Sequence, residues 1–342
     1  MSKRIAFCAD GTWDGVSNNT NVYKIFKAIQ PIPGEQIVNY DDGVGEDGNP
    51  VEKLLGGAFG AGLVQKIKQG YSDISDDYED GDEVFIFGFS RGAFTARSLA
   101  GMIAVSGLPA KQHDTNLVDT AFQAYRTKDP AQRKLLLDSI ASYGMVDAKI
   151  TMVGVWDTVG SLGIPAIFGG VSPLIYGFLD TGLHPDVLNA YHAVAIDERR
   201  AEFPATLWTS APAPGQTLEQ VYFCGVHCDV GGGYGDDQNG TALSDITLSW
   251  MMSKAQALGL VFAPNLLVTY PSPIDKKDAL DTKHESWNPL WTFPKSRDIA
   301  ANATIANSVD IRLQNDSSYR PSNLKLINGA LQPGYGSETV VI

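Results

Sequence analysis

Residues 81–97 read GDEVFIFGFSRGAFTAR, and at their centre lies a G-x-S-x-G motif, Gly88–Gly92. An apolar run, Val84–Phe87, precedes the motif, and a helix-compatible stretch, Ala93–Ser106, follows it. A sharp turn from strand to helix lifts a serine hydroxyl out of the backbone at the end of a sheet, and the flanking glycines let that strained turn close. The motif in this context predicts that Ser90 is a nucleophile.

Strand-like and helix-like segments alternate along the rest of the chain. The other expected strands are near-continuous apolar runs at Arg4–Ala9, Gln36–Tyr40, Ile150–Val155 and Val221–Val226. This pattern predicts an α/β fold, α/β-hydrolase-like, with a mainly parallel sheet and helices on both faces. We expect one domain over residues 1–342, a helix over Pro185–Ile196, and an irregular tail from about Ala300 with a few packed pieces. Residues 160–185 are rich in apolar side chains and are expected to form a lid or pocket wall, or a packed connection.

The composition excludes several classes of partner. The net charge is −13, and Lys and Arg form no cluster, so we expect no nucleic-acid binding. Three cysteines are too few for a disulfide framework. No signal peptide and no apolar run of about 18 residues is recognisable, so we expect no transmembrane segment and a cytoplasmic location by default. Signal-independent secretion and transient membrane contact stay open, and the oligomeric state is not determined.

Polar turns follow four of the expected strands. They are Asp10-Gly11-Thr12, Gly88–Gly92, Trp156-Asp157-Thr158 and His227-Cys228-Asp229. In open α/β sheets, functional groups collect beyond the carboxyl ends of the strands. A serine nucleophile needs a base, and the base needs a carboxylate that holds its tautomer. The chain order Ser90, Asp157, His227 is the order expected for a nucleophile on a strand-to-helix turn, so His227 is the predicted general base and Asp157 its orienting group.

Other residues compete for these roles. The remaining histidines are His113, His184, His192 and His284. His184 lies in an apolar loop from which it could reach the site, whereas His113 and His284 lie in polar surroundings typical of the surface. His192 falls in the expected helix, and the charged cluster after it, Asp197–Arg200, is interpreted as a structural ion-pair network. Asp229 and Asp197 are alternatives to Asp157.

Acyl transfer also requires hydrogen-bond donors for the developing oxyanion. The amide of Arg91 is one predicted donor, and the turn Gly11-Thr12 supplies the second. Asp10 either fixes that turn or takes part in the site. No cofactor is expected, although an acidic group could hold Ca²⁺. That group would be Asp10, Asp229, Asp236 and Asp237.

Eight segments of the chain, in order, resemble one known family. They are Phe7–Asp14 (FCADGTWD), Asp42–Gly45, Gly81–Arg97, Gly154–Gly160 (GVWDTVG), His192–Arg200 (HAVAIDERR), Gly225–Tyr234 (GVHCDVGGGY), Leu243–Met251 and Tyr319–Leu324 (YRPSNL). The chain is similar in these segments to the domain of the Tle1-type effector phospholipases, α/β-hydrolases associated with type VI secretion. The resemblance implies an α/β-hydrolase fold, a Ser-Asp-His triad and lipid ester hydrolysis. Ser90 matches the family nucleophile, and Asp157 and His227 lie within shared segments.

The sequence thus predicts a serine ester hydrolase that acts on an acyl lipid through an acyl-enzyme on Ser90. Two alternatives stay open. One is an esterase that acts on small soluble or polymeric esters, and the other is a catalytically silent hydrolase-fold module that only binds.

Overall fold

The computed structural model describes residues 2–11, 19–42, 58–110, 113–159, 181–237, 240–271, 274–289, 291 and 293–341. Thr12, a predicted oxyanion donor, lies outside these ranges, as do residues 160–180 of the predicted lid.

An eight-stranded sheet forms the centre of the molecule, and all of its neighbouring strands pair in parallel. Its strands are β1 (Arg4–Ala9), β2 (Gln36–Asp41), β3 (Glu83–Phe89), β6 (Ile150–Trp156), β7 (Asn189–Ala195), β8 (Thr217–Phe223), β9 (Thr304–Ala306) and β12 (Gly336–Glu338). They are arranged in the order β12-β9-β8-β7-β6-β3-β1-β2. Two small antiparallel pairs lie apart from it, β4 (Leu108–Pro109) with β5 (Met145–Val146) and β10 (Leu326–Ile327) with β11 (Ala330–Leu331).

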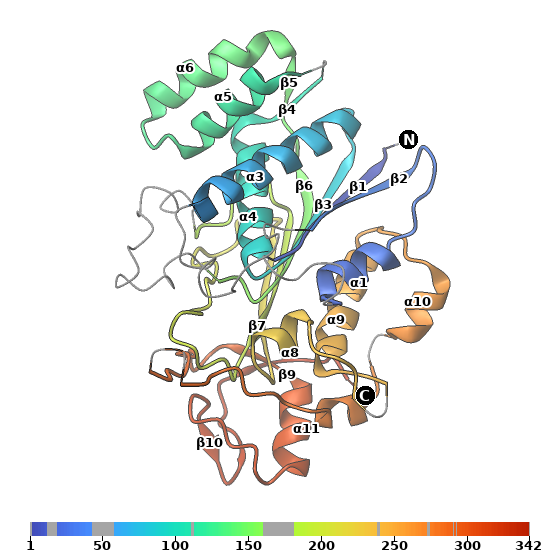
Figure 1. The fold of residues 1–342 in the computed structure, drawn as a ribbon, viewed down its shortest axis with the longest axis vertical. Helices are drawn as coiled ribbons and strands as arrows, with labels where there is room; N and C mark the ends of the chain where they lie inside the picture. Colours follow the sequence, from blue (N-terminus) through green and yellow to red (C-terminus); the bar gives the residue numbers. More distant parts are fainter. Residues whose placement is uncertain are drawn as a thin grey trace.

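Helices cover both faces of the sheet, as the sequence predicts (Figure 1). One face carries α3 (Ala58–Asp77), α4 (Arg91–Ser106), α5 (Thr115–Arg126) and α6 (Pro130–Ile140). The other carries α1 (Asn21–Ala28), α9 (Leu243–Ala257) and α11 (Asn307–Asn315). The short helices are α8 (His227–Gly231) and α10 (Pro264–Thr269), with 3₁₀ turns at Ala141–Tyr143 and Lys276–Leu280. No helix in the described part of the chain combines the length and hydrophobicity that crossing a membrane requires.

The alternation of side chains along β3 explains why helices must pack on both faces of the sheet. Phe85, Phe87 and Phe89 belong to the buried cluster that includes α1 and α9, whereas Val84 and Ile86 belong to the cluster that includes α3 and α4. Successive side chains of a strand point to opposite faces, so an apolar run such as this one is stable only when both faces are buried.

Two expectations for the second half of the chain are wrong. Residues 189–195 form strand β7, not part of a helix over Pro185–Ile196. The segment NAYHAVA contains three alanines, which favour helix locally, but it pairs with β6 on one side and β8 on the other. Tertiary pairing outweighs such weak local preference. The tail is also more regular than expected, because β9 and β12 extend the sheet.

The strand order places one topological switch point beside Ser90. From β1 the chain first adds β2 on one side and then crosses to β3 on the other, so β1 lies between them. Parallel strands end at the same edge, and the crevice outside a switch point is where open α/β sheets bind ligands. The turns after β1, β3 and β6 therefore meet at one edge of the sheet.

Candidate active site

The turn that carries Ser90 joins β3 directly to α4. Ser90 has φ 59° and ψ −118°, a strained conformation for a residue with a side chain. A Cβ atom at Gly88 would lie 2.4 Å from the carbonyl oxygen of Gly92, and one at Gly92 would lie 2.1 Å from the carbonyl oxygen of Ala9. Only glycine fits at these two positions, so the motif forms the tight turn that it predicts.

Three side chains from different strand ends form one hydrogen-bonded chain. Nε2 of His227 lies 2.8 Å from Oγ of Ser90, and Nδ1 of His227 lies 2.6 Å from Oδ2 of Asp157. The side chains are almost completely buried, since the exposed fractions are 4% for Ser90, 3% for His227 and 0% for Asp157. An ionised Asp157 accepts a hydrogen bond from Nδ1–H of His227, and this leaves the lone pair of Nε2 facing the serine hydroxyl. The arrangement can therefore take the proton from Ser90.

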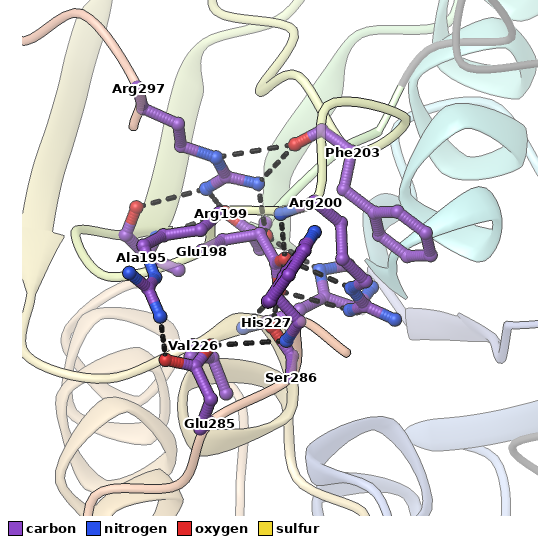
Figure 2. Close-up of polar contacts among 12 residues, drawn as sticks. Ala195, Glu198, Arg199, Arg200, Phe203, Val226, His227, Glu285, Ser286 and Arg297 are labelled. Carbon is purple, nitrogen blue, oxygen red and sulfur yellow. Dashed lines mark hydrogen bonds and ion pairs between the residues drawn. The ribbon is translucent and has the colours of Figure 1, made fainter. Parts of the chain in front are cut away.

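The far side of Asp157 contacts a cation, Arg297. Its Nη1 and Nη2 donate to the two carboxylate oxygens at 2.6 and 2.9 Å, and the backbone amide of Ala195 donates to Oδ1 at 2.9 Å. The same guanidinium donates to the carbonyl oxygens of Ala195 and Phe203 (Figure 2). Burial alone would raise the pKa of Asp157, but the charge of Arg297 and the hydrogen bond from His227 outweigh it and hold that pKa well below its usual range. Asp157 therefore stays ionised although no water reaches it.

A second polar cluster holds the backbone of His227. The amide of His227 donates to Oε2 of Glu198 at 3.2 Å, and Arg200 binds both Glu198 oxygens, each at 2.9 Å (Figure 2). The hydroxyl of Ser286 donates to the same carboxylate. The cluster Asp197–Arg200 thus contains the ion pair expected of it. Burial would raise the pKa of Glu198, but the hydrogen bond and charge of Arg200 lower it.

Aromatic rings enclose the imidazole of His227. The ring of Phe89 lies 4.6 Å from it and the ring of Phe203 lies 5.1 Å from it, both measured between centroids. The guanidinium of Arg200 covers Phe203 at 3.6 Å. Such an apolar cage strengthens the electrostatic contacts of the imidazole because it excludes water.

Two of the predicted auxiliary residues, Asp229 and His184, pair with residues other than Ser90, His227 and Asp157. Asp229 faces His284, whose Nδ1 lies 2.6 Å from its Oδ1, and it accepts a further bond from the backbone amide of His284. Burial raises the pKa of Asp229. His284 stacks on Tyr234 at 3.8 Å and is only partly exposed, so it is not the free surface residue that its polar surroundings indicate. His184 contacts Asp186 and lines a separate cavity.

The predicted oxyanion donors have different surroundings. The amide of Arg91 lies in the first turn of α4, directly after Ser90. The amide of Gly11 donates to Oδ1 of Asp10 at 2.8 Å, so it would have to leave that carboxylate to serve an oxyanion. Oδ2 of Asp10 accepts from Thr20 at 2.5 Å and from Tyr40 at 2.9 Å, which favours the role of fixing the turn. The oxyanion roles stay predictions.

The contacts of His192, the alternative general base, which lies in β7, indicate a structural role. Its Nε2 accepts from the backbone amide of Thr158 at 3.1 Å, and its ring lies edge-on to Trp208. Burial, together with the charge of Arg97, lowers the pKa of His192 to about 3. It is therefore neutral, and it supports the turn that carries Asp157.

The acidic residues considered for Ca²⁺ do not converge in the described part of the chain. Within those residues, no three His, Cys, Asp or Glu side chains are arranged to hold a metal ion. The calcium expectation stays a prediction.

The sequence alone does not reveal Arg297 as a contributor to the site, and it does not reveal the pairing of Asp229 with His284 outside it. Arg297 lies 140 residues after Asp157, in a segment with no motif, and His284 lies 55 residues after Asp229. Neither residue stands in a recognisable sequence motif, because its role depends on a carboxylate that only folding brings close to it.

Comparison with known proteins places this geometry in context. The model of the family described as "T6SS, Phospholipase effector Tle1-like, catalytic domain" matches residues 3–254. An uncharacterized protein of Saccharomyces cerevisiae is 30% identical over 235 residues, and the match covers 61% of this chain and 33% of the yeast protein. The chain thus spans about a third of the length of this curated relative.

Two solved structures are similar in outline. One is an uncharacterized protein from Pseudomonas aeruginosa, at 17% identity and a TM-score of 0.47, covering 79% of this chain and 49% of that one. The other is the Tle1 effector bound to the VgrG spike of the type 6 secretion system, at 16% identity and a TM-score of 0.44, covering 85% of this chain and 82% of that one.

Proposed function

Since this chain belongs to the family of Tle1-like phospholipase effector catalytic domains, we propose that it is a serine ester hydrolase that acts on acyl lipids. The observation that carries the proposal is the hydrogen-bonded chain of Ser90, His227 and Asp157 at the switch point of the sheet. The family description supports a lipid ester as the substrate class, and the buried, pre-aligned serine supports covalent catalysis.

The first half of the reaction forms an acyl-enzyme. Oγ of Ser90 attacks the ester carbonyl carbon while its proton passes to Nε2 of His227, and a tetrahedral oxyanion results. When the intermediate collapses, the bond to the alcohol oxygen breaks and His227 gives its proton to the departing alkoxide. The backbone amide of Arg91 is the proposed donor to the oxyanion, a contact worth about 3 kcal/mol of barrier in comparable sites.

The second half repeats the same proton transfers with water. His227 takes a proton from a water molecule that attacks the acyl carbon, and it returns that proton to Oγ of Ser90 as the fatty acid leaves. Asp157 holds Nδ1 protonated throughout, and it stabilises the imidazolium formed in each half. Because Arg297 binds both oxygens of Asp157, the carboxylate cannot rotate away from His227.

A fluorophosphonate probe tests the nucleophile. The purified protein is incubated with the probe, and the adduct is located by peptide mass mapping. We expect the adduct on Ser90, and we expect its loss in Ser90→Ala and in His227→Ala. A folded protein that takes no label, with or without detergent and Ca²⁺, would instead support the silent binding module.

Chain-length preference tests the substrate class. We expect hydrolysis to rise steeply from two-carbon to long acyl esters and to extend to phospholipid vesicles. A preference for two-carbon esters together with inactivity on vesicles would contradict the lipid assignment and favour the small-ester alternative. The Ser90→Ala variant is the control for contaminating activity.

A further inference from the structure

A cavity of about 610 Å³ lies beside α4, away from the residues that contact Ser90. It is bordered by α4, by the end of α5 and the turn into α6, by β6, and by the segments 181–187 and 208–210. Its volume is in the range of sites that hold a small organic ligand.

Among the described residues, the charged side chains that line this cavity are all of one sign. Its charged residues are Arg97, Arg126, Lys128 and Arg133. No Asp or Glu is among the described residues that line it, although Asp and Glu outnumber Lys and Arg by 39 to 26 in the chain. A concave site lined by one sign of charge concentrates ions of the opposite sign. The cavity is therefore a local exception in a protein of net charge −13.

Arg97 is the buried cation of this group, with only 5% of its surface exposed. One nitrogen, Nη1, donates to the carbonyl oxygen of Thr206, and the guanidinium stacks over the ring of Trp208 at 4.2 Å. Nε and Nη2 find no hydrogen-bond partner among the described residues. Burial lowers the pKa of Arg97 to about 9, and no carboxylate in the described ranges forms an ion pair with it.

A buried guanidinium without a counter-ion is energetically unfavourable, and an anion held in the adjoining cavity would offset this cost. Three further cations line the cavity and add charge, and the hydroxyl-bearing residues Thr181 and Ser210 also line it. Several cations converging on one space fit a group with more than one anionic oxygen better than a single carboxylate.

We propose that this cavity binds the phosphoryl group of an anionic ligand, with Arg97 as its buried anchor. The group can come from a lipid headgroup or from a soluble phosphate ester. Arg97 follows Ser90 by about two turns of the same helix, about 10 Å along its axis. Binding here does not require Ser90 to be a nucleophile, so the inference stands or falls independently of the proposed function.

Binding is measured in the Ser90→Ala background, in which no hydrolysis can consume the probe. The soluble arm uses calorimetric titration with glycerol 3-phosphate at low ionic strength. The lipid arm uses sedimentation with phosphatidylcholine vesicles that contain phosphatidic acid, compared with vesicles of equal charge made with oleate. Oleate separates recognition of phosphate from simple attraction to negative charge.

Substitutions assign the binding to the cavity. Arg97→Gln should weaken it by about tenfold or more, because a charged hydrogen bond is lost. Lys128→Ala should weaken it by about threefold, since an exposed charge contributes less. Lys134→Ala is the matched control: Lys134 lies one residue after Arg133, is exposed, and pairs with Asp138 outside the cavity. If Arg97→Gln does not fold, the double substitution of Arg126 and Lys128 by Gln replaces it.

Each outcome decides the proposal. Binding of glycerol 3-phosphate that is lost in the cavity variants supports it with a soluble ligand. Binding only to phosphatidic acid vesicles, with the same losses, supports it with a lipid headgroup. Absence of saturable binding in both arms overturns it, as does equal binding to oleate vesicles or an equal loss in Lys134→Ala.

Discussion

Replacing Arg297 by glutamine should both destabilise the protein and slow the labelling of Ser90. Arg297 makes two bonds to Asp157, at 2.6 and 2.9 Å, and both side chains are buried. Removing one member of such a pair leaves an uncompensated buried charge, which costs about 3–5 kcal/mol. At about 2.1 cal/mol/K per residue, unfolding of 342 residues as one unit has an entropy of about 0.7 kcal/mol/K. The loss therefore corresponds to a decrease in Tm of about 4–7 °C.

The sign of the pH effect follows from the depressed pKa of Asp157. A carboxyl whose folded pKa lies below its unfolded value contributes stability that is present at neutral pH and lost as the pH falls below about 4. Arg297→Gln removes that contribution, so the free energy of unfolding of the variant should fall less steeply below pH 4. At the site, the carboxylate of Asp157 loses the contact that stops it from rotating away from His227. The rate of fluorophosphonate labelling of Ser90 should therefore fall.

Calorimetry and labelling rates measured across pH 3–9 check both effects. Arg199→Gln is the control, because it removes a guanidinium from an exposed ion pair with Glu285 and should cost at most about 1 kcal/mol. The reasoning is refuted if Arg297→Gln keeps the Tm of the parent, or if it loses stability while the rate of Ser90 labelling stays unchanged.

Three further predictions concern the surroundings of the site. Gly92→Ala should destabilise the protein severely, because the added Cβ would lie 2.1 Å from a backbone oxygen. Gly235→Ala is the control, since a Cβ there has nothing within 4 Å, and the expression level and Tm of the two variants are compared. His192→Gln should flatten the decrease in stability between about pH 6.5 and 3, where the unfolded chain binds a proton that buried His192 does not; urea unfolding at each pH tests this, and an unchanged slope would count against it. Thr20→Val should lower the free energy of unfolding by about 1–2 kcal/mol, because Thr20 caps α1. An unaltered urea midpoint would contradict this prediction.

The first half of the chain could be interpreted from local patterns. The strand Arg4–Ala9 has the predicted bounds, and Thr20, a residue type typical of helix N-caps, caps α1. Strands that are buried on both faces can be recognised in the sequence as continuous apolar runs, and turns and helix ends can be recognised by their typical residues. The segment 189–195 carries no such signal, because its alanines suit either a helix or a small-residue strand. Its place between β6 and β8 decides the outcome.

The sequence by itself determined that a serine lies on a glycine-flanked turn between a strand and a helix, and that Asp157 and His227 follow strand ends. Both properties are local, since they depend on the order of neighbouring residues. Tertiary structure alone decided that His227 meets Asp157 while His284 meets Asp229, and that Arg297 binds the carboxylate from behind. These pairings join residues 55 to 140 positions apart. Their energies depend on burial and on distances of a few ångströms, which exist only once the sheet has assembled.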